Sequence, residues 1–69
     1  MDIKTAFELV RKRHKEPLKD SFELDNVFAF ILDTDTDIDL IVCVDKKTSK
    51  ILYTNIVGLD MMMRGIYNE

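Results

Sequence analysis

The chain has 69 residues, of which 46% are hydrophobic and 33% charged, and its formal net charge is −3 at pH 7. This length holds one domain, and the composition excludes collagen-like repeats and intrinsic disorder. The single cysteine excludes an internal disulfide framework. The charges that interrupt the apolar runs exclude a signal peptide and a membrane span. We therefore expect one cytoplasmic domain over residues 1–69.

The first predicted element is a helix that begins at Ile3. Its apolar residues recur at the spacing of one helical face, and they are Ile3, Ala6, Phe7 and Val10. The carboxylate of Asp2 can accept hydrogen bonds from the unpaired N–H groups of the first turn. The basic residues 11–15 suit the negative end of the helix dipole, and Pro17 predicts that the helix ends by about residue 15.

Apolar segments in the middle of the chain predict strands, at residues 27–32, 38–45 and 51–56. Residues 21–24 alternate weakly and form either a short strand or an extended lead-in. The short turns at residues 33–37 and 46–49 favour an antiparallel meander. After Gly58, the helical spacing of Leu59, Met62, Met63 and Ile66 predicts a short helix over residues 59–67, with an end weakened by Gly65. The predicted fold class is α+β.

The strand at residues 27–32 is apolar on both faces. Phe28, Phe30 and Leu32 share one face, which we expect to lie under the N-terminal helix, and Val27, Ala29 and Ile31 share the other. An uncovered second row would leave an apolar patch larger than most monomers expose. Either the C-terminal helix or a second subunit is expected to cover it.

The acidic residues gather in the middle of the chain, because residues 20–45 contain no Lys or Arg. We predict partner-binding side chains in this block and in the C-terminal helix, namely Asp33, Asp35, Asp37, Asp39, Met61 and Met62. A block of this kind can steer a basic partner, and methionines can adapt to varied surfaces. The ordinary interpretation is a solvated turn for the aspartates and core packing for the methionines.

Residues 33–37 also resemble two known loops, and both matches fail. The loop resembles the DxDx[TV] nucleophile loop of haloacid-dehalogenase-type phosphatases, but Asp37 replaces Thr or Val, and that parallel fold needs a longer chain. It begins like an EF-hand, but Ile38 stands where the turn needs Gly and Val44 where the site needs Glu. No catalytic, cofactor-binding or metal-ligating residue is therefore predicted, although a weak cation site in these carboxylates stays open.

The remaining chemically active side chains also favour ordinary roles. Cys43 lies in an apolar strand and is expected to be a small buried hydrophobe. His14, between two basic residues at the predicted helix end, is expected to face solvent. The basic run at residues 11–15 could contact phosphate, but the acidic net charge and the absence of a nucleic-acid-binding motif favour no nucleic-acid partner.

Two segments carry a resemblance. Residues 42–51 resemble the VDKKTGKI-type hairpin of small uncharacterised bacterial α+β proteins, and residues 5–12 resemble their N-terminal helix. Some of those proteins look like toxin-immunity proteins and others like PepSY-type modules, so the resemblance implies a binding or structural role. The present chain has Ser49 where that pattern has Gly, and a positive φ there would cost Ser about 1 kcal/mol.

These observations predict a non-enzymatic protein-interaction module that needs no cofactor. It either self-associates, for example as a homodimer, or docks to another protein. One alternative is an acidic, immunity-like inhibitor that covers a basic toxin with residues 33–39. The other is a small metal-dependent enzyme.

Overall fold

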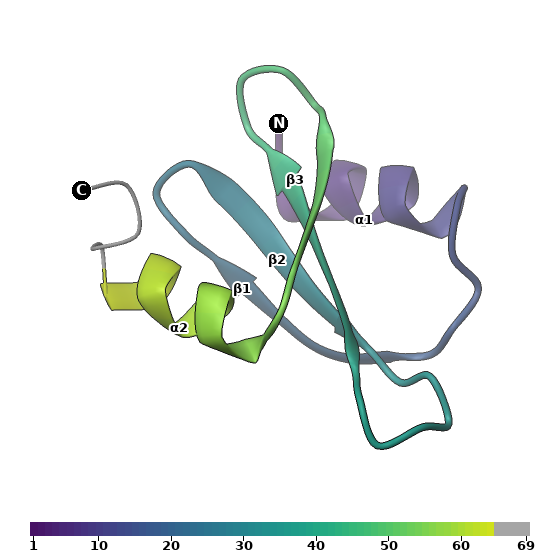
Figure 1. Cartoon of the computed structure of the whole chain (residues 1–69). Coiled ribbons are helices and arrows are strands. Elements are labelled where there is room, and N and C mark those ends of the chain that lie inside the picture. The colour runs from purple at the N-terminus through teal and green to yellow at the C-terminus, as the bar shows by residue number, and fades with distance from the viewer. Residues whose placement is uncertain (65–69) are drawn as a thin grey trace.

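The computed structural model describes residues 1–64, except for the side chains of Met62 and Arg64. The elements follow in the order α1 (Ile3–Arg11), β1 (Leu18–Glu23), β2 (Val27–Leu32), β3 (Leu40–Asp45), β4 (Ile51–Thr54) and α2 (Ile56–Arg64). The strands form one antiparallel sheet in the order β1-β2-β3-β4 (Figure 1). The α+β class and the meander are confirmed, and the weakly alternating segment is a strand.

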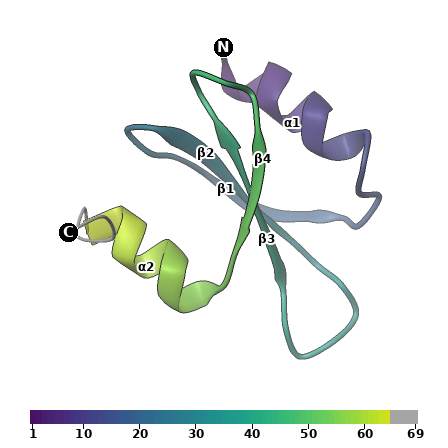
Figure 2. The same ribbon diagram turned by 45° about the horizontal axis from the view of Figure 1, so that its top comes forward.

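The two helices lie on opposite sides of the sheet (Figure 2). Neither of these described helices is long and apolar enough to cross a bilayer. The predicted continuation of α2 to residue 67, with Gly65 and Ile66, lies outside the described residues.

Helix α1 begins as predicted and ends earlier. Asp2 Oδ1 accepts a hydrogen bond from the N–H of Thr5 at 2.8 Å, which caps the first turn. At the other end, the N–H groups of Arg13 and His14 both donate to the carbonyl of Val10, at 3.0 and 2.9 Å. This tight turn ends the helix at Arg11, about four residues before the end that Pro17 predicts.

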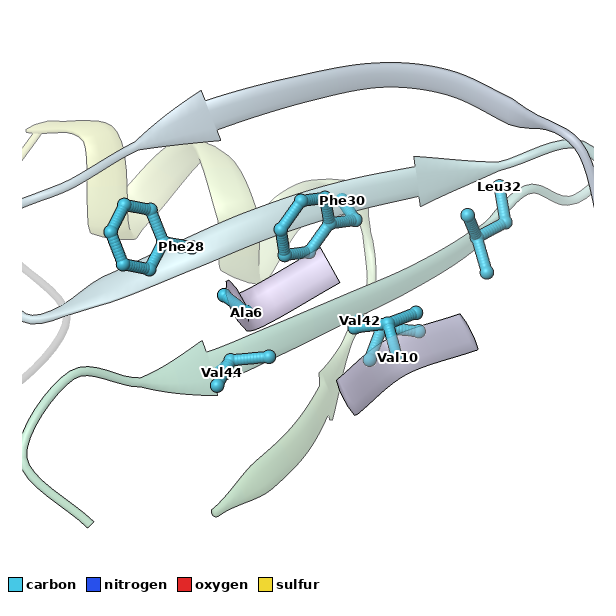
Figure 3. Packing of buried hydrophobic residues seen from close by; sticks show 7 residues of the cluster. All are labelled: Ala6, Val10, Phe28, Phe30, Leu32, Val42 and Val44. Carbon is cyan, nitrogen blue, oxygen red and sulfur yellow. The ribbon is translucent and has the colours of Figure 1, made fainter. Parts of the chain in front are cut away.

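The side of the sheet under α1 holds the larger core cluster (Figure 3). Phe28, Phe30 and Leu32 point from β2 toward α1, as predicted. They pack with two small residues of the helix and two valines of β3, which are Ala6, Val10, Val42 and Val44. All seven side chains are at most 2% exposed, so this cluster supplies most of the hydrophobic stabilisation of the fold.

A second cluster fills the opposite side of the sheet and is covered by α2. Val27, Ala29, Ile41 and Cys43 are buried there together with Leu59, which is 2% exposed. The second apolar row is therefore covered within the chain. Of the two covers that the sequence allows, the C-terminal helix is the one observed.

Helix α2 begins three residues before its predicted start, and β4 ends two residues before its predicted end. The cause is Asn55, whose Oδ1 accepts a hydrogen bond from the N–H of Gly58 at 2.8 Å. Asn is a favoured N-cap residue, so the chain turns into a helix at Ile56. A Cβ at position 58 would meet Oγ1 of Thr54, so any larger residue there requires the Thr54 side chain to move.

The β3–β4 turn contains Ser49 in the strained backbone conformation for which the sequence resemblance expects Gly. Asp45 Oδ1 accepts hydrogen bonds from the N–H groups of Lys47 and Thr48, at 2.8 and 2.9 Å, and so fixes the turn. The turn closes with Ser49 at a φ of 62°, in the left-handed region. Ser49 therefore occupies a conformation that suits Gly better.

Candidate interaction surfaces

Hydrogen bonds from two threonine hydroxyl groups fix the conformation of the acidic loop between β2 and β3. The Oγ1 atoms of Thr34 and Thr36 both donate to the carbonyl of Ile38, at 2.7 and 2.9 Å. Asp33 Oδ1 accepts a hydrogen bond from the N–H of Asp35 at 3.1 Å, and Asp35 has a φ of 63°. The side chains of Asp33, Asp35 and Asp37 are exposed. They form a fixed, negatively charged end of the molecule.

Two details of this loop differ from the sequence interpretation. Ile38 was predicted to start a strand, but β3 begins at Leu40 and Ile38 lies in the loop with 79% of its surface exposed. Asp39 is not a free acid like its neighbours, because it pairs with Nζ of Lys19 at 2.9 Å. That hydrogen bond raises the pKa of Lys19 above its ordinary value.

The loop carboxylates are not gathered into a cation site. Within residues 1–64, no group of three or more acidic, histidine or cysteine side chains is arranged to hold a metal ion. The geometry of this loop therefore adds nothing to the weak cation site that the sequence leaves open.

Helix α2 exposes apolar side chains around much of its circumference. Ile56, Val57 and Met63 are all more than half exposed, and Met61 is 37% exposed. Met61 is thus at the surface as the partner-binding prediction requires, whereas the side chain of Met62 lies outside the described residues. We call Ile56, Val57, Met61 and Met63 the α2 surface.

A basic groove separates the end of α1 from β4. It has a volume of about 500 Å³, and it is lined by Leu9, Lys12 and Arg13 on one side and by residues 49–52 on the other. Lys50 brings a third cation to it. The sequence analysis assigned Lys12 and Arg13 to a solvated helix end and missed this groove. The one sequence signal was that Lys12 and Arg13 follow Leu9 by three and four residues, which places them beside Leu9 on the same side of the helix.

His14 does not face solvent as predicted, because its ring packs against Tyr53 of β4. Its side chain is 19% exposed, and its Nε2 lies 2.8 Å from the hydroxyl of Tyr53. The two rings meet edge to face, with centroids 5.6 Å apart. Glu16 Oε1 lies 3.9 Å from Nδ1 of the same ring. This contact fastens the segment after α1 to β4.

Cys43 cannot cooperate with His14, because the sheet separates them. Cys43 lies in the cluster under α2, whereas His14 contacts Tyr53, which pairs with Val42 on the α1 side. Burial raises the pKa of the Cys43 thiol above its ordinary value. The thiol is therefore a core group and a poor nucleophile at neutral pH.

Comparisons with protein-family models, with curated proteins and with solved structures gave no match to this chain.

Proposed function

We propose that this chain is a non-enzymatic protein-interaction module that associates with a second copy of itself through the α2 surface. The observation that carries the proposal is the mismatch between the composition of α2 and its burial. The only charged residues between Ile56 and Arg64 are Asp60 and Arg64. Their spacing of four residues places both charges on one stripe of the helix, and the rest of its sequence is apolar apart from Gly58. So wide an apolar surface is normally buried, yet Leu59 is the one residue of α2 described as buried.

The exposed side chains lie on both sides of α2. Ile56 and Met63 fall three residues before and four residues after Leu59, so they share its helical stripe, but they are 66% and 52% exposed. Val57 and Met61 fall on the opposite side of the helix. Among the described side chains of α2, the sheet therefore buries only Leu59, and a partner that packs along the helix would bury the exposed ones.

A second copy is the partner that this surface fits. The two charges in α2 have opposite signs, so two copies that meet in antiparallel orientation bring no net repulsion. A two-fold axis would set the same apolar residues against each other, which is the usual arrangement of a homodimer. A highly charged partner would find no complementary charge here.

Analytical ultracentrifugation over a wide concentration range tests this proposal. We expect the wild-type chain to dimerise with little dependence on salt, because apolar association is weakly screened. The double substitution Val57→Lys and Met61→Lys should give a monomer, and the control Ile38→Lys, at an exposed apolar residue far from α2, should stay dimeric. A wild-type chain that remains at 8.1 kDa at millimolar concentration would overturn the proposal.

The acidic loop favours a second candidate, an inhibitor that covers a basic site on another protein. The favouring observation is Ile38, an exposed apolar side chain held between Asp37 and Asp39 in a loop fixed by hydrogen bonds. An apolar anchor within a charged rim is typical of binding hot spots. Association by this loop should weaken steeply with salt and be lost with Asp35→Asn and Asp37→Asn. Self-association through α2 should be unaffected by either change.

A further inference from the structure

The basic groove runs along the outer edge of β4. Ile51 pairs with Val44 and faces α1, whereas Leu52 pairs with Cys43 and faces α2. Both residues line the groove. A depression that touches consecutive residues from opposite faces of one strand must border the edge of that strand. Since β4 is the last strand in the sheet, its outer backbone groups are not paired with another strand in residues 1–64.

The two edges of this sheet differ in their protection. Strand β1 carries Lys19, Asp20 and Glu23, and its register shifts between Leu18 and Asp20. Charges and bulges of this kind prevent an edge from pairing with another chain. Strand β4 has the sequence ILYT, without a charge, and its regular pairing with β3 shows no such shift. The edge of β4 is therefore the one that can accept a further strand.

The groove is positively charged in an acidic protein. Lys12, Arg13 and Lys50 are exposed at its rim, and none of its lining residues in the described part of the chain is acidic. None of the three cations forms an ion pair within the described part of the chain. Leu9, Ile51 and Leu52 supply an apolar surface between them. The groove thus offers cations, apolar contacts and a free strand edge together.

We propose that this groove binds a short, extended, acidic peptide segment of another protein, which adds to the sheet beside β4. The strand edge would bond the peptide backbone, and alternate side chains would reach either the three cations or the apolar floor. The strand edge favours a peptide over a nucleic acid, because a phosphate backbone cannot continue a β-sheet ladder. The groove lies between α1 and β4, and the α2 surface lies across the sheet, so the two proposals can fail separately.

The experiment uses the whole chain and a short synthetic peptide in which Glu and Val alternate, with binding followed by calorimetry and by amide chemical shifts. We expect salt-sensitive binding, with shifts confined to β4 and the last turn of α1. Replacing Lys12, Arg13 and Lys50 together with Glu should lower the affinity at least about tenfold. A control with Glu at Lys4, Lys15 and Lys47 makes the same change of net charge outside the groove and should bind almost as well as wild type.

Two further probes separate strand addition from simple attraction of anions. The same peptide N-methylated at every residue has no backbone donor on either edge and should not bind. A single-stranded oligonucleotide of similar charge should also fail to bind. Equal affinity for the methylated peptide, tighter binding of the oligonucleotide, or an equal loss in both triple variants would each overturn the proposal.

Discussion

His14 and Tyr53 connect the segment after α1 to the edge strand, through a contact of 2.8 Å between Nε2 and the hydroxyl. The two residues are 39 positions apart in sequence. The contact joins the segment after α1 to β4, next in sequence to Arg13 and Leu52, which line the basic groove.

Replacement of Tyr53 by Phe should remove the hydrogen bond and keep the edge-to-face ring contact. Because Tyr53 is about half exposed, we expect a loss of unfolding free energy of about 0.5 to 1 kcal/mol. Urea denaturation measures it. His14→Ala in both backgrounds completes a double-mutant cycle, and a coupling of zero between the two changes would contradict the assignment.

Ser49→Gly should stabilise the protein. The φ of Ser49 is 62°, and relief of that strain outweighs the greater flexibility of Gly in the unfolded chain, by about 0.5 to 1 kcal/mol. Thermal and urea denaturation measure the gain. Ser49→Ala is the matched control, because Ala keeps the Cβ and should give no gain. Equal changes of stability in the Gly and Ala variants would mean that the Ser49 hydroxyl, and not the positive φ, determines the stability of this turn.

Asp45 should make the fold sensitive to acid. The backbone N–H groups of Thr48 and Lys47 hold the pKa of Asp45 below its ordinary value of 3.8. The ionised carboxylate therefore stabilises the folded state above the unfolded pKa, and this contribution is lost as the pH falls through the lower folded-state pKa. In Asp45→Asn, unfolding free energy should fall less between about pH 5 and pH 2. Asp37→Asn is the matched control for the loss of one negative charge, because it leaves the hydrogen bonds of Asp45 intact.

Cys43 should report whether α2 stays docked. A thiol reagent should react slowly with the native protein, since burial both hides the sulfur and raises its pKa. Leu59→Ala removes the buried side chain of α2 and should speed the reaction and destabilise the fold by about 2 to 4 kcal/mol. Val57→Ala, on the exposed side of α2, should leave the rate unchanged. Fast labelling of the wild type would show that α2 does not shield this face.

Gly58 and Thr54 should be energetically coupled. Ala at position 58 gains helix propensity of about 1 kcal/mol over Gly, but its Cβ would meet Oγ1 of Thr54. We expect Gly58→Ala to lower the unfolding free energy in the wild type and to raise it in a Thr54→Ala background. Denaturant titrations of the four proteins give the coupling. The same effect in both backgrounds would rule out the collision.

The sequence predicts best where local patterns and tertiary packing agree. The bounds of β2 are those predicted, since an unbroken apolar run is buried on both faces. The Asn55 cap was missed because the strand was extended through Thr54 and Asn55 to the next apolar residue, Ile56, although Asn is a weak strand residue. The early end of α1 follows from the tight turn at the Val10 carbonyl. Arg11 Nη1 donates to the carbonyl of Glu16 at 2.7 Å just beyond that turn, a contact that no local pattern encodes.

The surfaces were predicted less well than the fold. The acidic loop is visible in sequence because its residues are consecutive. The basic groove is not, because Lys12 and Lys50 come together only when β4 takes its place beside β3. The exposure of Ile38 was not predicted, because its alternation with Leu40 is typical of a strand. In the structure, the hydroxyls of Thr34 and Thr36 donate to the carbonyl of Ile38 and hold this segment as a loop.

The meander has a kinetic consequence. Every strand pairs with its neighbour along the chain, so each hairpin closes a short loop before the next one is added. Mixed α/β domains fold at rates between those of helical bundles and those of all-β barrels, on the order of milliseconds. We therefore expect a single rapid refolding phase in stopped-flow experiments. The folding chain then exposes its two apolar sheet faces only briefly.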